Sequence, residues 1–392
     1  MKSWIEISES RLRNNVASIR AAAGENANVL AVIKADGYGH GAELIAPVLV
    51  AAGVMWLGVG DVDEGARVRR ALGEQDARVL VMCGIEPGDA DRIVEQRLTP
   101  VVWTPSHVQA LEIAAERAGH RVAVHLEIDS GMARQGAAPG AELEGVLAAL
   151  RGTRWLRLEG VFSHLSSSEV RAGKRTAAQL EKFQEALDTI YGTGDLIPEL
   201  LHLANTSALD EGSTTQWMQQ AAEKISATVL VRPGLAVYGY CLEIENENSG
   251  FTGTSSSCGL SHLVQPVLTW KTSVIGTREI APGQPVGYGA TFVADRPMRL
   301  ALLPVGYADG FRREASSGVG NGWVQIAGKR APVVGRVSMN LTVVDVTNIP
   351  EAAEGVEVTL LGSGVAAEDH ARWCGTIPYE ILCGIRATKR LI

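Results

Sequence analysis

The chain has 392 residues, more than a single hydrophobic core usually serves, so we expect two domains. Its composition, 46% hydrophobic and 20% charged, is that of a globular protein, and a net charge of −8 supplies no basic surface for nucleic acid or an anionic membrane. Charged residues run through the opening MKSWIEISESRLRNN, so we expect no signal peptide and a cytoplasmic protein.

Up to about residue 240, short β-branched runs alternate with polar or glycine loops and segments of helical period. The predicted strands are VLAVI, MWLGV, ARVLVMC, LTPVVW, VAVHLEI, RLEGVF, ELLHLAN and VLVRPGL. Eight strand and helix units of this total length predict a (β/α)8 barrel of the TIM type over residues 1–240, with a doubly wound sheet as the alternative. Pro and Gly interrupt the longest apolar stretches, so no membrane span is predicted.

Residues 241–392 have a different sequence pattern. Short strands such as LTWKTSV, MRLALLPVG and LTVVDV are separated by turn residues, which predicts a mostly antiparallel β domain. A polar, Ser- and Gly-rich stretch at about residues 243–263 has no period and is interpreted as an insertion. The five cysteines are odd in number and form no CxxC pair, which indicates reduced thiols and no zinc site.

In a barrel the active site lies where the strands end, so the residues that follow the predicted strands are the candidates. They include one lysine, Lys34, several donors and glycines that free backbone N–H groups, and they contain no set with metal-ligand spacing; the donors are Arg134, His164, His202, Asn205, Thr206 and Arg232. A lysine amine with phosphate-binding loops fits a phosphorylated carbonyl cofactor, for which pyridoxal phosphate (PLP) is the natural candidate. Each residue alone also has a structural interpretation, as a buried histidine, a helix cap or a surface ion pair.

Eight motifs together carry a resemblance to the alanine racemase family of PLP enzymes over nearly the full length. They are AVIKADGYGHG, DSGMARQG, LHLANTS, VRPGLAVYG, VGYGAT, LPVGYADGF, VGRVSMN and YEILCG. The resemblance implies a PLP barrel followed by a β domain that the first ten or so residues join. It also implies a head-to-tail homodimer with shared active sites, which interconverts L-alanine and D-alanine and supplies D-alanine for peptidoglycan.

The same resemblance implies two catalytic bases. Lys34 resembles the lysine that holds PLP and acts as the base for the D-enantiomer, and Tyr288 resembles the tyrosine that the partner subunit contributes as the opposite base. His164 and His202 resemble the histidines that connect this tyrosine to Arg232, which pairs with the pyridine nitrogen of PLP. Because arginine does not readily give up a proton, that nitrogen stays unprotonated, and return of a proton to the α carbon is favoured over transamination.

Further positions match family residues around the cofactor and the substrate. Those expected at the cofactor, mostly at its phosphate, are Tyr38, Asn205, Thr206, Gly234, Leu235 and Tyr379. Those expected at the substrate carboxylate are Arg134 and the Met339 backbone, and those expected at the entry corridor are Tyr307, Arg313, Arg336 and Glu169.

Two positions depart from the family pattern. Glu127 stands where many members have a carbamylated lysine, and we hypothesise that its carboxylate pairs directly with Arg134. Asn340 stands where the family usually has aspartate, which removes a negative charge near the substrate carboxylate.

Other activities stay open at this point. A methyl and a hydroxymethyl group differ by only about 1 to 3 kcal/mol in such a pocket, so a serine racemase or a racemase of broader range is an alternative. A decarboxylase of the same barrel type is disfavoured because Arg232 stands where those enzymes place a carboxylate. A non-catalytic PLP-binding relic is disfavoured by the retention of both Lys34 and Tyr288.

Overall fold

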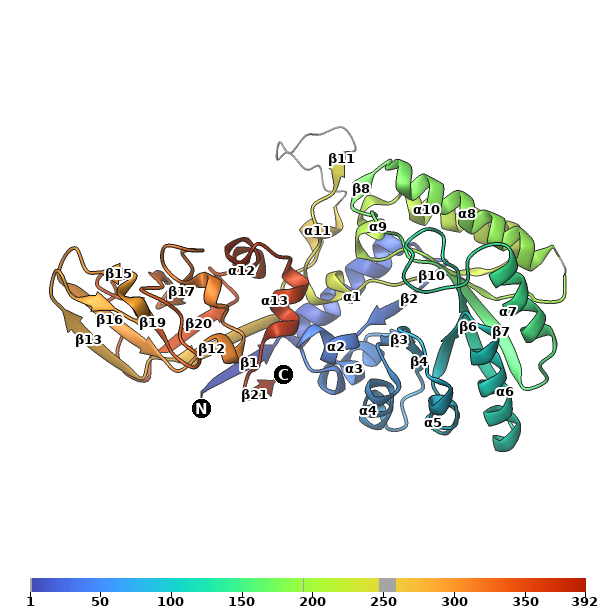
Figure 1. The fold of residues 1–392 in the computed structure, drawn as a ribbon, viewed down its shortest axis with the longest axis horizontal. Coiled ribbons are helices and arrows are strands. Elements are labelled where there is room, and N and C mark those ends of the chain that lie inside the picture. The colour runs from blue at the N-terminus through green and yellow to red at the C-terminus, as the bar shows by residue number, and fades with distance from the viewer. Residues whose placement is uncertain (1, 193, 247–258) are drawn as a thin grey trace. The chain divides into compact units, whose positions relative to one another are not determined.

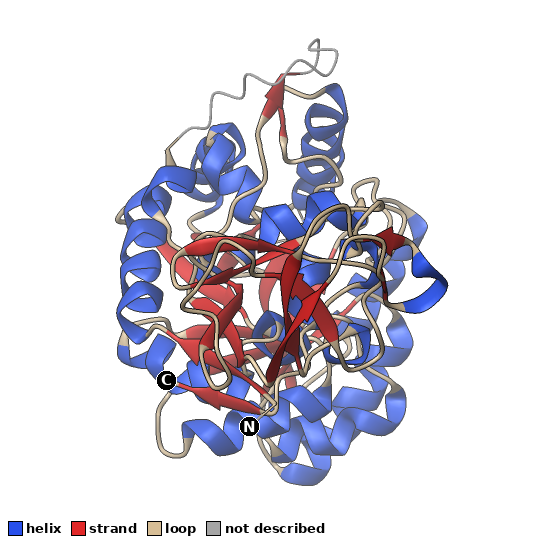
Figure 2. Ribbon diagram, turned by 90° about the vertical axis from the view of Figure 1, so that its left-hand side faces the viewer, coloured by secondary structure: helices blue, strands red, loops and turns tan. Residues whose placement is uncertain are grey.

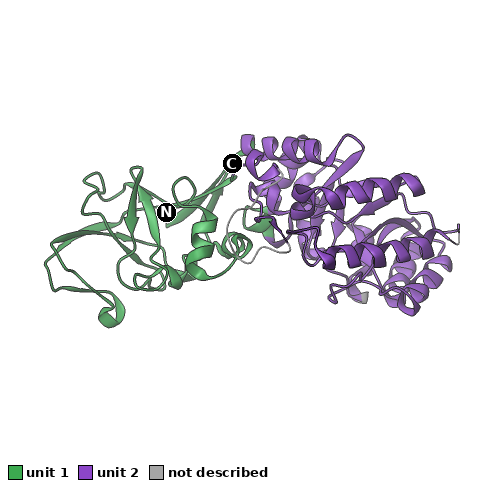
Figure 3. Cartoon of the chain, turned by 90° about the horizontal axis from the view of Figure 1, so that it is seen from above, with its two compact units in different colours: residues 1–9, 36–41, 266–392 green, residues 10–35, 42–265 purple. Residues whose placement is uncertain are grey.

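The computed structural model describes residues 2–192, 194–246 and 259–392. The chain divides into two compact units, which are described separately and are coloured in Figure 3. Unit 1 takes residues 1–9, 36–41 and 266–392, and unit 2 takes residues 10–35 and 42–265. Of the expected insertion at 243–263, residues 247–258 lie outside the described residues, while β11 (Glu245–Asn246) pairs with β8 (Val170–Arg171).

Unit 2 is a closed barrel of eight strands, which confirms the predicted fold. The strands are all parallel and follow the order β10-β2-β3-β4-β5-β6-β7-β9. Their bounds are β2 (Ala27–Val32), β3 (Trp56–Val59), β4 (Arg78–Val81), β5 (Thr99–Val102), β6 (Val122–Glu127), β7 (Leu156–Phe162), β9 (Leu200–His202) and β10 (Thr228–Val231). Parallel strands in a closed barrel place all their carboxyl ends on one face, where the candidate residues of unit 2 lie.

Helices lie outside these strands, as Figure 1 and Figure 2 show. They are α1 (Glu9–Ala23), α3 (Ala42–Ala51), α4 (Val62–Leu72), α5 (Ala90–Glu95), α6 (Pro105–Ala118), α7 (Ala141–Arg151), α8 (Lys174–Tyr191), α9 (Thr206–Glu211) and α10 (Ser213–Ile225). Over the described residues, none of the helices has both the length and the apolar character needed to cross a membrane.

Local sequence explains where these helices begin and end. In α6, Thr104 accepts a hydrogen bond from the backbone N–H of His107, Pro105 occupies the first helical position, and Gly119 ends the helix in a left-handed conformation with φ of 73°. In α4 the buried positions include Val62 and Leu72 on the face that packs toward the strands. Each helix thus returns the chain to the amino end of the next strand.

Unit 1 is built mainly from short strands. Its largest sheet has the order β18-β17-β20-β12-β1-β21, in which β1 (Ser3–Ile7) pairs antiparallel with β12 (Leu268–Ser273) and parallel with β21 (Lys389–Leu391). The other members are β17 (Trp323–Ile326), β18 (Lys329–Pro332) and β20 (Glu357–Leu361). A second sheet joins β13 (Gly276–Ile280), β16 (Met298–Leu303) and β19 (Thr342–Asp345), and the helices α12 (Ala367–Cys374) and α13 (Pro378–Gly384) follow. The first strand of the chain therefore completes the C-terminal sheet.

Candidate active site

The lysine of the opening motif stands where the chain leaves the barrel strand. Strand β2 ends at Val32, and Lys34 begins α2 (Lys34–Tyr38), in which Ala35, Asp36 and Tyr38 have φ of 53°, 54° and 50°. These are left-handed values, which cost an L-residue about 1 to 2 kcal/mol each. Backbone strain of this kind is concentrated at functional sites, so it supports a special role for the turn after Lys34.

Two tyrosine rings of unit 1 lie together beyond this turn. The rings of Tyr38 and Tyr379 have centroids 5.6 Å apart, and Tyr379 is in α13. Close approach of the two segments needs Gly39, because a Cβ there would lie 2.3 Å from the carbonyl oxygen of Leu382. Both phenols expected at the cofactor phosphate are therefore brought to one place.

Backbone N–H groups and a hydroxyl form a compact donor set near the ends of β9 and β10. Thr206 is buried, and its Oγ1 accepts hydrogen bonds of 3.2 Å from the backbone N–H groups of Gly234 and of Ala236. Asn205 accepts from the N–H of Ala208 at 2.9 Å and so caps α9. A hydroxyl beside several N–H groups at the end of barrel strands is the donor chemistry that a phosphate requires, so these residues fit the phosphate of PLP.

Arg232 follows β10 and is 3% exposed. Its Nη2 donates to the carbonyl oxygen of Ser163 at 2.7 Å, its Nη1 lies 3.2 Å from His202 Nδ1, and Nη2 lies 3.5 Å from His164 Nδ1. Burial lowers the pKa of Arg232 to about 10, against the opposing charge of Glu127. The guanidinium is therefore still protonated at neutral pH, and neutral groups fix its orientation.

A chain of hydrogen bonds runs from Arg232 into the barrel interior. Burial and the charge of Arg232 lower the pKa of His202 well below its ordinary value, so its ring is neutral. Since arginine can only donate, His202 Nδ1 accepts and its Nε2–H donates to His125 Nδ1 at 2.9 Å. His125 Nε2–H then faces Glu159 Oε2 at 3.4 Å. In each of these hydrogen bonds the donor is on the side of Arg232 and the acceptor is on the side of Glu159. This common direction fixes the tautomers of both histidines.

The far end of this chain is an ion-pair cluster. Glu159 accepts from Arg78 Nη2 at 2.5 Å and from Arg157 Nη2 at 2.6 Å. Burial would raise the pKa of Glu159, but the hydrogen bond from His125 and the charges of Arg78 and Arg157 lower it to about 2. The carboxylate is ionised at any ordinary pH.

His125 and Glu159 were not predicted from the sequence. Both are buried inside otherwise apolar predicted strands, VAVHLEI and RLEGVF. A polar residue in such a strand must find a buried partner, and that signal could have identified the pair.

His164 is a neutral hydrogen-bond donor toward the face where the strands end. Burial, followed by the charges of Arg232, Arg134 and Lys34, lowers the pKa of His164 to about 3. Because its Nδ1 accepts from Arg232, the ring proton is on Nε2. Arg134 and His164 line the same small pocket, and Arg232 lies 3.5 Å from His164 Nδ1.

The expected direct pair of Glu127 with Arg134 is not formed in this structure. Within the described part of the chain the two form no ion pair, and Glu127 Oε2 accepts instead from Gln135 Nε2, whose other hydrogen bond goes to the carbonyl oxygen of Met82 at 2.8 Å. The reason is the turn after β6, where Asp129 Oδ1 accepts from three successive N–H groups and Gln135 is the side chain that reaches back. Burial raises the pKa of Glu127 to about 7, although Gln135, Arg232 and Arg134 act in the opposite direction.

Of the remaining expected residues, Glu169 belongs to unit 2 and the others belong to unit 1. Tyr288 lies in a one-turn helix, η3 (Tyr288–Ala290), and its side chain is 70% exposed. Met339 is 57% exposed, and Asn340 Nδ2 contacts Asp309 Oδ2 at 3.4 Å. Tyr307 is also exposed, and Arg336 lies beside the glycines that flank Tyr288. Tyr288 and Met339 are thus presented on the surface of unit 1, while Lys34 and Arg232 belong to unit 2.

Comparison with known proteins gives matches over the whole chain. Residues 7–241 match the family described as alanine racemase, N-terminal domain, and residues 267–392 match alanine racemase, C-terminal domain. An alanine racemase of Syntrophobacter fumaroxidans is 36% identical over 98% of this chain and 95% of its own length. The structure of the alanine racemase from Streptomyces coelicolor is 33% identical, with a TM-score of 0.85 over 100% of this chain and 97% of that chain. The alanine racemase of Bartonella henselae with covalently bound pyridoxal phosphate shares the fold at 24% identity, with a TM-score of 0.81 over the full length of both chains.

Proposed function

The chain belongs to the alanine racemase family of PLP-dependent isomerases, and we propose that Lys34 and Tyr288 are the two bases with which it interconverts L-alanine and D-alanine. The observation that carries this proposal is Arg232, a buried cation held by imidazoles and a carbonyl oxygen rather than by a carboxylate. An arginine at the pyridine nitrogen gives no proton to the ring, which suits racemisation better than transamination.

We propose a separate role toward PLP for each of these residues. Lys34 would hold it covalently and Arg232 would face the ring nitrogen, while the phosphate would take its donors from Tyr38, Thr206, Gly234, Leu235 and Tyr379. PLP, once bound, withdraws electrons from the α carbon of the amino acid and so weakens the bond to its proton.

Racemisation needs a base on each side of the α carbon, because one fixed group cannot remove a proton from one face and return it to the other. The Lys34 amine would exchange the proton on one face and the Tyr288 phenol on the other. His164 Nε2–H points its donor away from Arg232, where it can hydrogen-bond the phenol oxygen. Arg134 and the Met339 backbone would orient the substrate carboxylate.

The hydrogen-bonded chain behind Arg232 gives that arginine its fixed position. His202 and His125 each have one tautomer available, since the chain begins at a donor and ends at the acceptor Glu159. We propose that Glu159 and His125 are positioning residues, which act on the cofactor ring only through Arg232. Preorganised donors of this kind cost no reorganisation during the reaction.

We further propose a homodimer in which Tyr288 serves the active site of the partner subunit. Four large apolar side chains of unit 1 are exposed on adjoining loops, Tyr288, Tyr307, Met339 and Leu341. A hydrogen bond from Tyr307 N to the Ser338 carbonyl oxygen joins the loops of Tyr307 and Met339, and Arg336 of the second loop lies beside the glycines that flank Tyr288. An exposed apolar patch that includes an expected catalytic residue supports a subunit interface there.

Subunit mixing tests both the bases and the shared site. Lys34→Ala and Tyr288→Phe are each expected to abolish racemisation of L-alanine in deuterium oxide, measured by D-alanine formation and deuterium at the α carbon. If the sites are shared, a hybrid dimer puts both defects in one site and leaves the other intact, so mixing the two variants should restore up to about a quarter of wild-type activity. Mixing each variant with itself is the control. Activity that stays absent after proven subunit exchange would contradict the shared site.

The place of the enzyme in the cell is a separate proposal. We infer a cytoplasmic racemase that supplies D-alanine for peptidoglycan, supported by the free thiols of Cys83, Cys241 and Cys374. Expression of the chain as given should allow growth of a bacterium that requires D-alanine, whereas the Lys34→Ala variant should not. Failure of the wild-type chain to rescue growth would speak against this role.

A further inference from the structure

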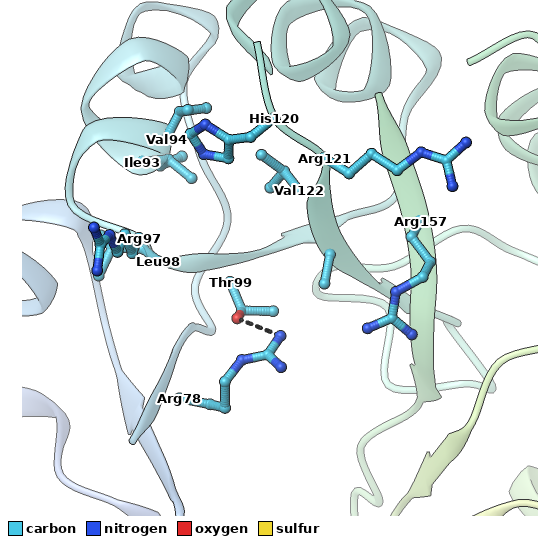
Figure 4. Close-up of a pocket in the computed structure, with 11 residues that line it drawn as sticks. Arg78, Ile93, Val94, Arg97, Leu98, Thr99, His120, Arg121, Val122 and Arg157 are labelled. Atoms are coloured by element: carbon cyan, nitrogen blue, oxygen red, sulfur yellow. Dashed lines mark hydrogen bonds between the residues drawn. The ribbon is translucent and has the colours of Figure 1, made fainter. Parts of the chain in front are cut away.

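A cavity of about 490 Å³ opens at the amino end of the barrel strands, opposite the end where the candidate active-site residues lie. Its walls come from the starts of β4, β5, β6 and β7 and from the loops that precede them, with α5 on one side, as Figure 4 shows. The polar lining residues are Arg78, Arg97, Thr99, His120, Arg121 and Arg157.

The lining of this cavity is positively charged, whereas the chain as a whole is negatively charged. Four arginines line it and no aspartate or glutamate does, although the chain as a whole carries a net charge of −8. The carboxylate of Glu159 is shared by Arg78 and Arg157. Glu199 also contacts Arg157, at 2.7 Å, but its side chain is largely exposed and screened by solvent. Two arginines therefore share one buried counter-charge, and an excess of positive charge remains.

Arg97 adds a cation that has no acidic partner within the described residues. It stands in the loop before β5 with φ of 51°, a left-handed conformation that glycine or asparagine adopts more easily. Arg69 lies behind this loop, where its guanidinium donates to the carbonyl oxygens of Ala77 and Arg97. Arg121 lies along the rim and donates to the carbonyl oxygen of Arg154 at 3.0 Å. The arginines thus line an open cavity whose own lining contains no acid to neutralise them.

We propose that this cavity binds the polyphosphate group of a small molecule, with Arg97, Arg78 and Arg157 as its ligands. The guanidinium fork matches phosphate oxygens two at a time, so three arginines that line one cavity favour an anion with several adjacent oxygens over a single halide. The volume lies within the range of small-molecule sites and exceeds what one phosphate group fills. The polyphosphate can be inorganic or part of a nucleotide, and the two sources are separated by experiment.

The site has a physical connection to the chain behind Arg232. Arg78 and Arg157 hold Glu159, which ends that chain, so an anion that drew these guanidinium groups outward would weaken their hold on Glu159. The binding proposal does not depend on the racemase proposal, because none of its ligands is an expected cofactor or substrate residue.

Calorimetric titration of the PLP-loaded enzyme tests the site, since bound PLP already fills the phosphate positions near Thr206. The probes are inorganic pyrophosphate, adenosine triphosphate and citrate at equal ionic strength. We expect saturable binding of pyrophosphate, adenosine triphosphate or both at one site per chain, and weaker binding of citrate. Binding of both would indicate recognition of the polyphosphate alone, and binding of adenosine triphosphate only would indicate a nucleotide.

The decisive variant is Arg97→Asn, because asparagine tolerates the left-handed backbone and removes only the guanidinium. It should weaken binding at least fivefold. Arg175→Asn, in the first turn of α8, removes the same charge from a residue that does not line the cavity and should change binding by less than twofold. No saturable binding of either phosphate probe, tighter binding of citrate, or equal effects of the two substitutions would overturn the proposal.

Discussion

The two ends of the barrel treat buried charge in opposite ways. At the carboxyl end, Glu127 is buried without an ion pair among the described residues, and its pKa is raised to about 7 by burial. Nearer the amino end, Glu159 on the adjacent strand contacts two arginines and His125, and its pKa is lowered to about 2 despite burial. Glu127 can change its charge near neutral pH, and Glu159 cannot.

The arginines at the two ends of the barrel also differ in their partners. Arg78 and Arg157 form ion pairs with the carboxylate of Glu159, whereas Arg232 is held by neutral acceptors and feels the charge of Glu127 without an ion pair to it. Perturbed and unmatched charges gather at functional sites, while matched ones serve structure. From this difference we propose that the amino end anchors the chain of histidines and that the carboxyl end, through Arg232, acts on the reacting groups.

The largest expected effect comes from making the same substitution at both ends. Arg232→Gln should lower kcat for alanine racemisation by about 100-fold to 1,000-fold, the usual cost of losing a preorganised charged donor. Arg78→Gln should lower kcat by less than about threefold, because Arg157 still holds Glu159. Both are measured by D-alanine formation at saturating PLP. Similar losses in the two variants would break the distinction between a reacting end and an anchoring end.

The sequence predicted the barrel because its signal is local. The strands are short aliphatic runs, such as VLAVI, most of them followed by a loop and a helix, and eight repetitions leave few alternatives. Lys34 and Arg232 could be predicted as site residues since they follow strands. Whether they act as proposed is for the experiments above to decide.

Contacts between strands could not be predicted in the same way. Glu127 and Arg134 are close in sequence, which favoured a direct pair, but the turn led by Asp129 brings Gln135 to the carboxylate instead. The link between His125 and His202 joins residues 77 positions apart, and only the barrel's strand order brings them together. Side-chain pairing across a closed barrel is a property of register, which one sequence does not reveal.

The next effect in size concerns the unmatched carboxylate. The pKa of Glu127 is raised in the folded state from 4.5 to about 7, so the stability it contributes is fully present below pH 4.5 and is lost as pH rises through 7. Between pH 5 and pH 8 this loss amounts to about 2 kcal/mol of unfolding free energy. Glu127→Gln keeps an acceptor for Gln135 and removes the ionisation, so the variant should lack this decline.

Urea unfolding of wild type and Glu127→Gln at both pH values measures the change. Glu159→Gln is the matched control: because the pKa of Glu159 is lowered to about 2, that residue titrates far below this range and the substitution should leave the pH 5 to pH 8 difference in place. Parallel stability curves for wild type and Glu127→Gln would contradict the view that Glu127 is the carboxylate without a matched charge.

The smallest expected effect tests whether Glu159, at the anchoring end, influences kcat. Glu159→Gln removes the negative charge at the end of the chain but still offers an oxygen to His125, so kcat should fall by only about threefold, a few tenths to one kcal/mol. Glu159→Leu removes the acceptor as well, frees the tautomers of His125 and His202, and should cost about tenfold. KM for alanine should not change, because Glu159 touches neither substrate nor cofactor.

A purely structural Glu159 would lower the unfolding free energy in both variants without the graded loss of kcat and without a change in the absorbance spectrum of bound PLP. Because Arg232 is the only proposed contact between this chain and the ring, combining Glu159→Leu with Arg232→Gln should then add nothing to the loss caused by Arg232→Gln alone.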